Sequence, residues 1–416
     1  MASFSIPLSG MAATSEALNI ISNNLANLNT DGYKDQQANF QDLFYQNYGS
    51  DGAGDPIQIG AGSEVGSTST NFSDGSLQDT GVNSNAAITG NGFFVTAEPN
   101  GTIQYTRNGD FTVNSSGQLV TTDGETVMGY PAVNGVVNQG ASLSSLNVGQ
   151  GQSSPPAATT TMQQTTNLDA ASPVGTTFST PMTVYDSLGE SHTLTFNYTM
   201  TAPNTWTYQV TLPAADTGGT GNPTVLASGT LNFNSSGNLT SPTGSVPVNL
   251  NGLADGAANM SVAWSLTNPT GSSLITQTAS TSATSTTNQN GYVGGTLQNF
   301  TIMQDGTIDG QFSNGQTQAI GQIALASFAN QQGLQLVGGG SYQSTLASGA
   351  AVVGAPNSGG LGTITGGAVE QSNVDISTEF TNLIIVQRAF EADARVVTTF
   401  DSVSSTTIDL QAEPGN

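Results

Sequence analysis

Apolar side chains recur at helical spacing near the start of the chain. The steps between them are seven, three, four and three residues, at Met11, Leu18, Ile21, Leu25 and Leu28. This spacing places the five side chains on one face of a helix, and neither Gly nor Pro interrupts the segment. The turn-forming run Asn29-Thr30-Asp31-Gly32 follows directly. We therefore predict an amphipathic helix over residues 9–28.

The other end of the chain repeats this pattern over a longer stretch, residues 373–410, which also lacks Gly and Pro. One apolar stripe consists of Ile376, Phe380, Leu383, Phe390, Ala394, Val397 and Ile408. A second stripe consists of Ile384, Val386, Val396, Phe400, Val403 and Leu410. Either Asp375 or Ser377 could cap the helix. A helix with two apolar faces needs cover on both, which one short N-terminal helix cannot provide.

Between the ends, apolar residues alternate with polar ones, which is typical of β-strands. Examples are Leu194/Phe196/Tyr198 and Trp206/Tyr208/Val210. The stretch Val113–Leu119 recurs as Phe233–Leu239 and, more loosely, as Ile302–Ile308. An apolar residue, a turn ending in Gly and a second apolar residue predict a hairpin at each place. Either independent convergence of hairpins on a similar turn sequence or an ancestral duplication explains this recurrence.

Two segments rich in small polar residues, 149–161 and 278–290, are typical of linkers. We therefore predict a mainly β, nested multidomain fold with α-helical termini. Residues 1–30 and 372–416 would form a helical coiled-coil domain, and residues 31–70 a connecting segment. Residues 71–148 and 287–371 would form a first β domain, into which a second β domain, residues 149–286, is inserted.

The charge balance excludes several kinds of partner. Four Lys and Arg stand against 28 Asp and Glu, which gives a formal net charge of −24. Nucleic acids and anionic membranes both require clustered basic residues, so we expect neither as a partner. No apolar run reaches the roughly 20 residues of a membrane span, and the N-terminus does not resemble a secretory signal peptide. The absence of cysteine excludes thiolate chemistry.

No constellation of catalytic residues is recognisable. His192 is the only histidine, and without a G-x-S-x-G motif we interpret it as a solvated residue at the start of a strand. Acids such as Asp123 and Asp186 lie in predicted turns, where they would hydrogen-bond the backbone. The acidic loops 51–55 and 305–309 lack the later bidentate acid of a calcium loop. We therefore predict no enzyme activity, no cofactor and no metal site.

The four basic residues are Lys34, Arg107, Arg388 and Arg395. Arg388 and Arg395 are seven residues apart and share nearly one face of the predicted C-terminal helix. They could pair with Glu391 on the same helix, or with Glu16 on another helix, including that of a neighbouring subunit.

Short motifs follow one another in order at both ends of the chain. The N-terminal motifs are Ser9-Gly10-Met11, Asn23-Asn24-Leu25-Ala26-Asn27 and Thr30-Asp31-Gly32-Tyr33-Lys34. The C-terminal motifs are residues 367–375, Glu379-Phe380 and Gln387-Arg388-Ala389-Phe390. Together these motifs resemble those of the bacterial flagellar rod and hook proteins. Residues 90–95 and 105–111 are similar to the first β domain of that family. Residues 185–189, 288–292 and 321–330 resemble its hook members in particular, whereas rod members lack the inserted block.

The resemblance implies a structural subunit that self-polymerises into the flagellar hook, a curved tube acting as a universal joint that transmits torque from rod to filament. It also implies export through the flagellar type III apparatus to the outside of the cell. The partners would be other copies of the chain and the rod, hook cap and hook–filament junction proteins. The helical positions that would carry polymerisation are Met11, Leu18, Ile21, Leu25, Leu28, Phe380, Leu383, Phe390 and Val397.

Two alternatives remain open from the sequence. One is an axial protein of the distal-rod type. The other is a secreted β-rich adhesin, which would present aromatic side chains such as Trp206 and Trp264 to a ligand. Both tryptophans lie in alternating strand patterns, which favours a place in the core instead.

Overall fold

The computed structural model describes residues 4–412, apart from residues 51, 53 and 150. The predicted fold class is confirmed: the chain is mainly β-strand, with α1 (Ser5–Ala26) near one end and α2 (Ile376–Ala412) near the other. The outermost residues of the predicted helical domain, 1–3 and 413–416, lie outside the described part. The chain divides into two compact units. Unit 1 comprises residues 1–149, 300–310 and 318–416, and unit 2 comprises residues 150–299 and 311–317.

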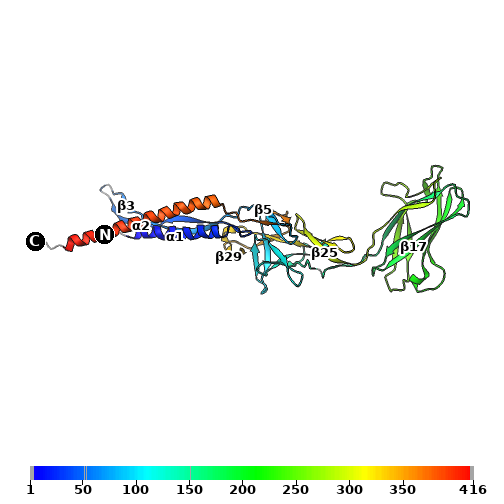
Figure 1. Cartoon of the computed structure of the whole chain (residues 1–416), viewed down its shortest axis with the longest axis horizontal. Helices are drawn as coiled ribbons and strands as arrows, with labels where there is room; N and C mark the ends of the chain where they lie inside the picture. Colours follow the sequence, from blue (N-terminus) through cyan, green and yellow to red (C-terminus); the bar gives the residue numbers. More distant parts are fainter. Residues whose placement is uncertain (1–3, 51, 53, 150, 413–416) are drawn as a thin grey trace. The chain divides into compact units, whose positions relative to one another are not determined.

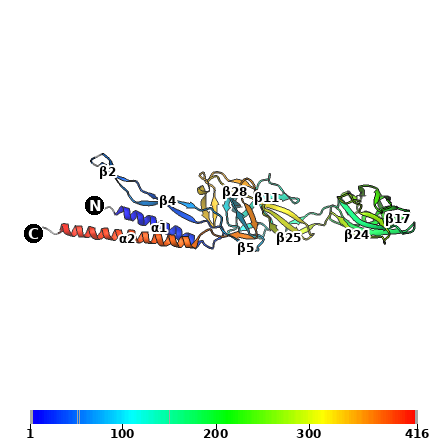
Figure 2. The same ribbon diagram turned by 90° about the horizontal axis from the view of Figure 1, so that it is seen from above.

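Within unit 1, α1 and α2 lie side by side (Figures 1 and 2). Helix α1 begins at Ser5, before the predicted start at Ser9. Pro7 lies in its first turn, where the N–H that proline lacks is not needed for a helical hydrogen bond. Of the two predicted caps of α2, Asp375 is the one used: the Thr378 amide donates to its Oδ1 at 2.9 Å. The rings of Phe4 and Phe400 meet edge to face, with centroids 6.0 Å apart.

The predicted connecting segment, residues 31–70, forms two antiparallel β-ribbons. Strand β1 (Gln36–Asp42) pairs with β4 (Ser63–Thr70), and β2 (Gln46–Ser50) pairs with β3 (Pro56–Ile59). Strands β1 and β4 also contact α1 (Figure 2). Most residues of β1 and β4 are polar on both faces, so they lack the alternation that identifies a strand in sequence.

The β core of unit 1 is built from segments on both sides of the insertion. Strand β7 (Phe93–Ala97) pairs with β28 (Leu325–Ser327), and β11 (Thr126–Val133) pairs with β27 (Thr317–Ile323). Phe94 and Phe111 are fully buried and pack edge to face at 5.0 Å. Of the remaining strands, β25 (Gly295–Ile302) and β26 (Thr307–Phe312) extend into unit 2. The others are β5 (Leu77–Asp79), β6 (Ala86–Thr89), β8 (Ile103–Thr106), β9 (Phe111–Val113), β10 (Leu119–Thr121), β12 (Val136–Val137), β13 (Ser144–Ser145), β29 (Gln335–Gly338), β30 (Ser341–Gln343), β31 (Val352–Gly354), β32 (Thr363–Gly366) and β33 (Ala368–Glu370).

Unit 2 contains two five-stranded sheets around one apolar core. The first runs in the order β16 (Thr177–Tyr185), β17 (Ser191–Ala202), β18 (Thr205–Leu212), β19 (Thr224–Phe233) and β20 (Leu239–Ser241). The second contains β21 (Ser245–Leu250), β22 (Met260–Ser265), β15 (Thr161–Asp169), β23 (Ile275–Thr278) and β24 (Ala283–Gln289); β14 (Ser153–Ser154) pairs with β25. Trp206 and Trp264 are both fully buried, so their predicted core role is confirmed. Trp264 packs against Phe196, with ring centroids 4.9 Å apart.

The recurring sequence motif forms the same hairpin turn in both units. Asn114 Oδ1 accepts hydrogen bonds from the amides of Ser116 and Gln118, both at 2.9 Å. In unit 2, Asn234 accepts equivalent bonds from the residues two and four positions further on. Gly117 and Gly237 both adopt φ of 80°, a left-handed conformation that favours glycine. The predicted hairpins are therefore confirmed.

The predicted linker 278–290 is instead largely β24, paired antiparallel with β15. The residues of β24 are small and polar, and most are exposed, so the composition resembles that of a linker although the backbone pairs with β15. The amino-acid composition describes only the side chains, whereas strands pair through backbone hydrogen bonds. A composition typical of linkers therefore does not exclude a paired strand.

Candidate assembly surface

The helix pair of unit 1 buries small side chains on one face of α1. The buried residues of α1 are Pro7, Ala13, Thr14, Ala17, Ile21 and Asn24. Of the predicted assembly positions near this end of the chain, only Ile21 is buried, and Met11, Leu18 and Leu25 of α1 are half-buried. Leu28 is also half-buried, but it lies beyond the end of α1 at Ala26, so the helix is shorter here than predicted. The small side chains permit close approach: a Cβ on Gly10 would lie 2.6 Å from Asp393 Oδ2 of α2. The larger apolar side chains of α1 thus stay partly accessible.

Helix α2 keeps a broad apolar face that nothing in the described part of the chain covers. Its most exposed large apolar side chains are Phe380, Ile384, Ile385, Val403, Ile408 and Leu410, with exposed fractions between 49% and 72%. Leu383, Phe390 and Val397 are half-buried. Val386 and Phe400 of the second predicted stripe are half-buried too, and Phe400 contacts Phe4. The exposed apolar side chains therefore come from both predicted stripes: Phe380 and Ile408 belong to the first, and Ile384, Val403 and Leu410 to the second.

A groove lies between α1, β1 and α2. It is lined by Ala17, Ile20, Ile21, Gln36, Gln37, Ala38, Phe40, Glu379, Asn382, Ile385 and Val386. Glu379 is almost fully buried there, and its Oε2 has no hydrogen-bond partner. Burial raises the pKa of Glu379, Asn24 opposes the rise through a hydrogen bond, and the charge of Asp35 adds to it.

Beyond the helix ends, two of the four basic residues form a buried ionic junction. Lys34 Nζ lies 2.6 Å from Glu370 Oε1, and both side chains are fully buried. Arg107 Nη1 lies 3.4 Å from Glu370 Oε2 and 3.3 Å from Asp74 Oδ1. The amide of Gly75 adds a third contact to the Glu370 carboxylate, at 2.8 Å. Burial lowers the pKa of Lys34, although Glu370 favours its charged form.

The junction brings together three of the sequence motifs. The amide of Gly32 donates to the Glu370 carbonyl at 2.6 Å. Gly32 has φ of 69°, and a Cβ there would lie 2.6 Å from the carbonyl carbon of Arg107. Only glycine therefore fits between the N-terminal motif and the β-domain hairpin. Sequence reasoning did not find this junction, although the scarcity of basic residues was a signal for it.

Two asparagine side chains connect the remaining motifs through hydrogen bonds. Asn24 of α1 is fully buried and exchanges two hydrogen bonds with the backbone of Gln36, at 2.8 and 3.0 Å. Asn373, just before α2, accepts from the amide of Asp35 at 2.8 Å and donates to the carbonyl of Asn71 at 2.8 Å. Both helices are thus fixed by side-chain-to-backbone bonds to the strand that leaves α1.

The predicted charge pairs of the helices remain predictions. Among the described residues, Arg388, Arg395, Glu391 and Glu16 take part in no ion pair, and all four are exposed. They are therefore accessible to a neighbouring copy of the chain.

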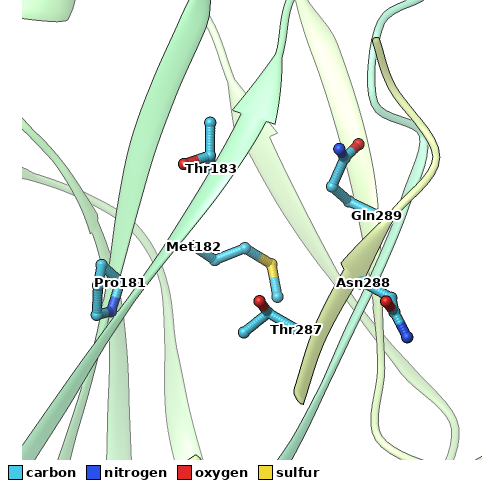
Figure 3. Close-up of a pocket in the computed structure, with 6 residues that line it drawn as sticks. All are labelled: Pro181, Met182, Thr183, Thr287, Asn288 and Gln289. Atoms are coloured by element: carbon cyan, nitrogen blue, oxygen red, sulfur yellow. The ribbon is translucent and has the colours of Figure 1, made fainter. Parts of the chain in front are cut away.

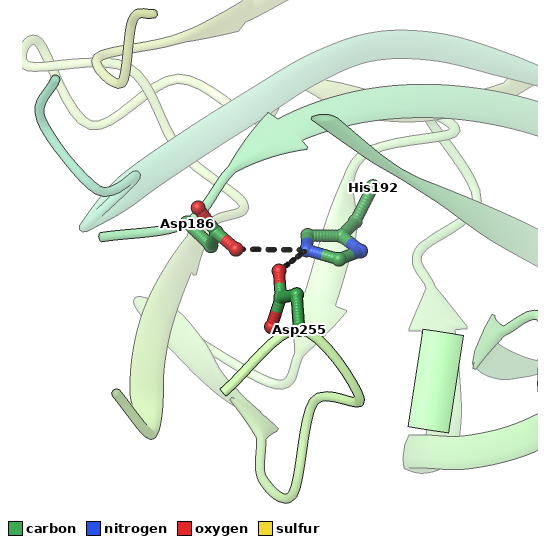
Figure 4. A group of neighbouring side chains, drawn as sticks. All are labelled: Asp186, His192 and Asp255. Carbon is green, nitrogen blue, oxygen red and sulfur yellow. Dashed lines mark hydrogen bonds and ion pairs between the residues drawn. The ribbon is translucent and has the colours of Figure 1, made fainter. Parts of the chain in front are cut away.

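The expectation that His192 is solvated is wrong. Its side chain is 5% exposed and lies among Asp186, Asp216 and Asp255 of unit 2. Figure 4 shows the ring with Asp186 and Asp255. The sequence could not reveal this because the three acids come from separate turns and loops. The predicted turn role of Asp186 is confirmed, since its Oδ1 accepts from the amides of Leu188 and Glu190.

Other candidate features offer little chemistry. A depression between β16 and β24 is lined by six uncharged residues: Pro181, Met182, Thr183, Thr287, Asn288 and Gln289 (Figure 3). In the loop 305–309, Asp305 accepts from the amide of Thr307, as a turn residue does. Asp51 of the other acidic loop lies outside the described residues. No helix in the described part is long and apolar enough to cross a membrane.

Comparisons with known proteins match nearly the whole chain. Residues 6–34 match the model of the flagella basal body rod protein, and residues 87–154 the D1 domain of the flagellar hook protein FlgE/F/G. Residues 153–292 match the D2 domain of the flagellar basal body protein FlaE, and residues 365–410 the C-terminal region of the basal body rod FlgEFG proteins.

Individual relatives extend over the same range. The flagellar hook protein FlgE of Salmonella typhimurium is 35% identical, covering 98% of this chain and 100% of its own length. The flagellar hook protein FlgE of Treponema pallidum is 33% identical, and the match covers 97% of this chain and 98% of the length of that protein. A solved structure of the Helicobacter pylori flagellar hook protein FlgE2 aligns with a TM-score of 0.48 and 16% identity, covering 69% of this chain and 98% of that one.

Proposed function

This chain belongs to the flagellar hook protein family, and from that premise we propose that it is a structural subunit of the bacterial flagellar hook. Copies of the chain polymerise into a tube in which the terminal helices form a coiled-coil layer. The tube acts as a universal joint that transmits torque from the rod to the filament. The near-complete coverage of the family's full-length relatives supports this proposal.

The observation that carries the proposal is the uncovered apolar face of α2. Each large apolar side chain contributes about 1.5–3 kcal/mol when it is fully buried. Six such side chains of α2 are roughly half exposed or more. A second copy of the chain can cover them. Phe380, which is one of the six, and the half-buried Leu383, Phe390 and Val397 are the α2 positions that would carry this contact. Glu16, Arg388 and Arg395 would then be available for charge pairs between subunits.

The proposed partners and location follow from the same premise. The chain would pass through the flagellar type III export apparatus and contact rod, hook cap and hook–filament junction proteins outside the cell. Its role is structural rather than enzymatic. A distal-rod-type protein is less well supported, because the match to a D2 domain spans residues 153–292. An adhesin is less well supported because Trp206 and Trp264 are buried.

The test replaces one exposed apolar residue of α2 with a charge. We expect Ile384→Asp to fold, by circular dichroism, and to form no tubes by electron microscopy at high protein concentration. The matched control is Val174→Asp, which places the same charge on an exposed valine of unit 2 and should form tubes normally. Tubes of ordinary length from Ile384→Asp would contradict the proposal.

Deleting residues 1–30 or 372–416 gives a second, independent test. Each deletion should abolish polymerisation while the β-sheets of both units stay folded. Unchanged tubes, or β-sheets that unfold with the helices, would count against a dedicated role of the helices in assembly.

A further inference from the structure

Four titratable side chains of unit 2 converge from three separate parts of its chain. Asp186 follows β16, and His192 is the second residue of β17, directly across from Val184. Asp216 lies in the short 3₁₀-helix Ala214–Thr217, and Asp255 in the loop between β21 and β22. The proposed assembly function uses none of them.

Two carboxylates are directed at the same ring nitrogen of His192. Asp186 Oδ2 lies 3.2 Å and Asp255 Oδ2 lies 3.7 Å from His192 Nε2, as Figure 4 shows. One N–H cannot donate well to two acceptors at once, and the two carboxylates repel each other. A cation bound among the three atoms would remove both difficulties. We propose that Asp186, His192 and Asp255 form a binding site for a divalent transition-metal ion such as Zn²⁺.

The spacing of the three atoms suits such an ion. Zinc binds imidazole nitrogen and carboxylate oxygen at about 2.0–2.2 Å, so two ligand atoms of a tetrahedral site lie roughly 3.3–3.5 Å apart. The two separations from Nε2, 3.2 and 3.7 Å, bracket this value, and all three atoms lie within 4.8 Å of one another. Only a small adjustment of Asp255 is needed, and its side chain is 27% exposed and free to make it.

The surroundings of the three ligands resemble the outer shell of a metal site. His192 Nδ1 lies 3.1 Å from Asp216 Oδ2, so Nδ1–H can donate to that carboxylate while Nε2 binds the ion. Metal-binding histidines usually make such a bond, which fixes the ring and its tautomer. Asp186 is oriented in the same way, because its Oδ1 accepts from the amides of Leu188 and Glu190 at 2.8 and 2.9 Å.

Two hydrogen bonds hold the three segments together without using the side chains of the ligands. The amide of Ala254 donates to the carbonyl of Asp216 at 2.9 Å. The amide of Ala258 donates to Ser187 Oγ at 3.0 Å. The site is therefore preorganised, with Asp186 and His192 buried and Asp255 open to solvent as a route of entry. A water molecule would complete the four-coordinate shell.

The donor set selects the kind of ion. Calcium and magnesium prefer six or more oxygen ligands, whereas imidazole with two carboxylates suits zinc and neighbouring transition metals. On binding, any proton on Nε2 leaves to solvent, and two negative charges are neutralised by the ion. The ion would join the turn after β16 to the loop before β22 and so stabilise this end of unit 2.

The test uses the full chain after treatment with a chelator. Both tryptophans are in the core of unit 2, so their fluorescence follows the unfolding of that unit. We expect Zn²⁺ to bind with one ion per chain in calorimetry and to raise the unfolding midpoint of unit 2. Asp255→Asn should abolish both effects, and Asp216→Asn should weaken binding by about 10–100-fold, as loss of an outer-shell partner does.

The matched control is Glu190→Gln, which removes one exposed negative charge from the same turn without touching the ligands. It should bind Zn²⁺ as tightly as the unmodified chain. Two results would overturn the proposal: an unfolding midpoint that Zn²⁺ does not change, or equal affinity in Asp255→Asn. Either would mean that the cluster is an ion pair of protonated His192 only. Because the readout is unit 2 alone, failure here leaves the proposed assembly function untouched.

Discussion

At the scale of single residues, Glu370 connects segments of unit 1 that are far apart in the sequence. Its carboxylate contacts Lys34, Arg107 and the amide of Gly75, and its backbone carbonyl accepts from Gly32. Burying charges costs free energy that only well-placed partners offset, so removing one partner leaves the others unpaired. A residue 336 positions from Lys34 in sequence thereby fixes the segment that follows α1.

We expect Glu370→Gln to lower the free energy of unfolding of unit 1 by about 3–5 kcal/mol, because it leaves two buried cations without their shared anion. Circular dichroism during urea unfolding would measure the loss, while tryptophan fluorescence from unit 2 should stay unchanged. Asp74→Asn is the matched control. Asp74 contacts the same Arg107 but is 40% exposed, so its loss should cost no more than about 1 kcal/mol. Equal effects of the two variants would contradict this account.

At the scale of elements, the packing of α1 on α2 should depend on pH through Glu379. Burial raises the pKa of this carboxyl above its usual value of 4.5, so the folded state binds a proton more readily than the unfolded state. The stabilisation that protonation gives is complete at low pH and is lost as the pH rises through the raised pKa. The helix pair should therefore become more stable as the pH falls from 7 towards 4.5, the usual pKa of this carboxyl.

Hydrogen exchange of the α1 amides, corrected for the intrinsic rate, measures this dependence. In Glu379→Gln the protection of α1 should no longer vary with pH over that range. The exposed Glu391 of the same helix provides the control, and Glu391→Gln should keep the pH dependence. A dependence that survives in Glu379→Gln would assign it to another group.

The elements also show what their sequences can and cannot predict. The two helices and the Asn-containing hairpins were predictable because their apolar or turn residues recur at a period set by local geometry. Strands β1, β4 and β24 were not, because polar side chains on both faces leave no period. The face of α1 that packs within the chain could not be predicted either, because its residues Ala13, Thr14 and Ala17 are small, whereas the larger Leu18 and Leu25 of the apolar stripe are only half-buried.

At the scale of the whole molecule, the two terminal helices were predictable from the sequence. The contacts that fix these helices to the β core of unit 1 were not. The motifs around Gly32, Arg107 and Glu370 were recognised one by one. Their meeting at one buried junction depends on contacts between segments hundreds of residues apart, which no local pattern records. The same holds for His192, whose three acidic neighbours come from separate turns and loops.

Most of unit 2 lies between two residues that are paired with each other, so this part of the chain can be removed without separating its flanking segments. Ala157 and Tyr292 exchange two backbone hydrogen bonds, each of 3.0 Å, as a paired antiparallel position does. An Asn-Gly turn can join such a pair, so it can replace residues 158–291 without strain. Unit 1 keeps both helices and its own core in this shortened chain.

If the uncovered face of α2 drives assembly, the shortened chain should still form tubes, which electron microscopy would detect. Adding Ile384→Asp to the shortened chain should abolish those tubes, as in the full chain, because the same apolar face is interrupted. A shortened chain that folds but stays monomeric would instead show that unit 2 supplies contacts which assembly requires. The helices would then be necessary for polymerisation without being sufficient for it.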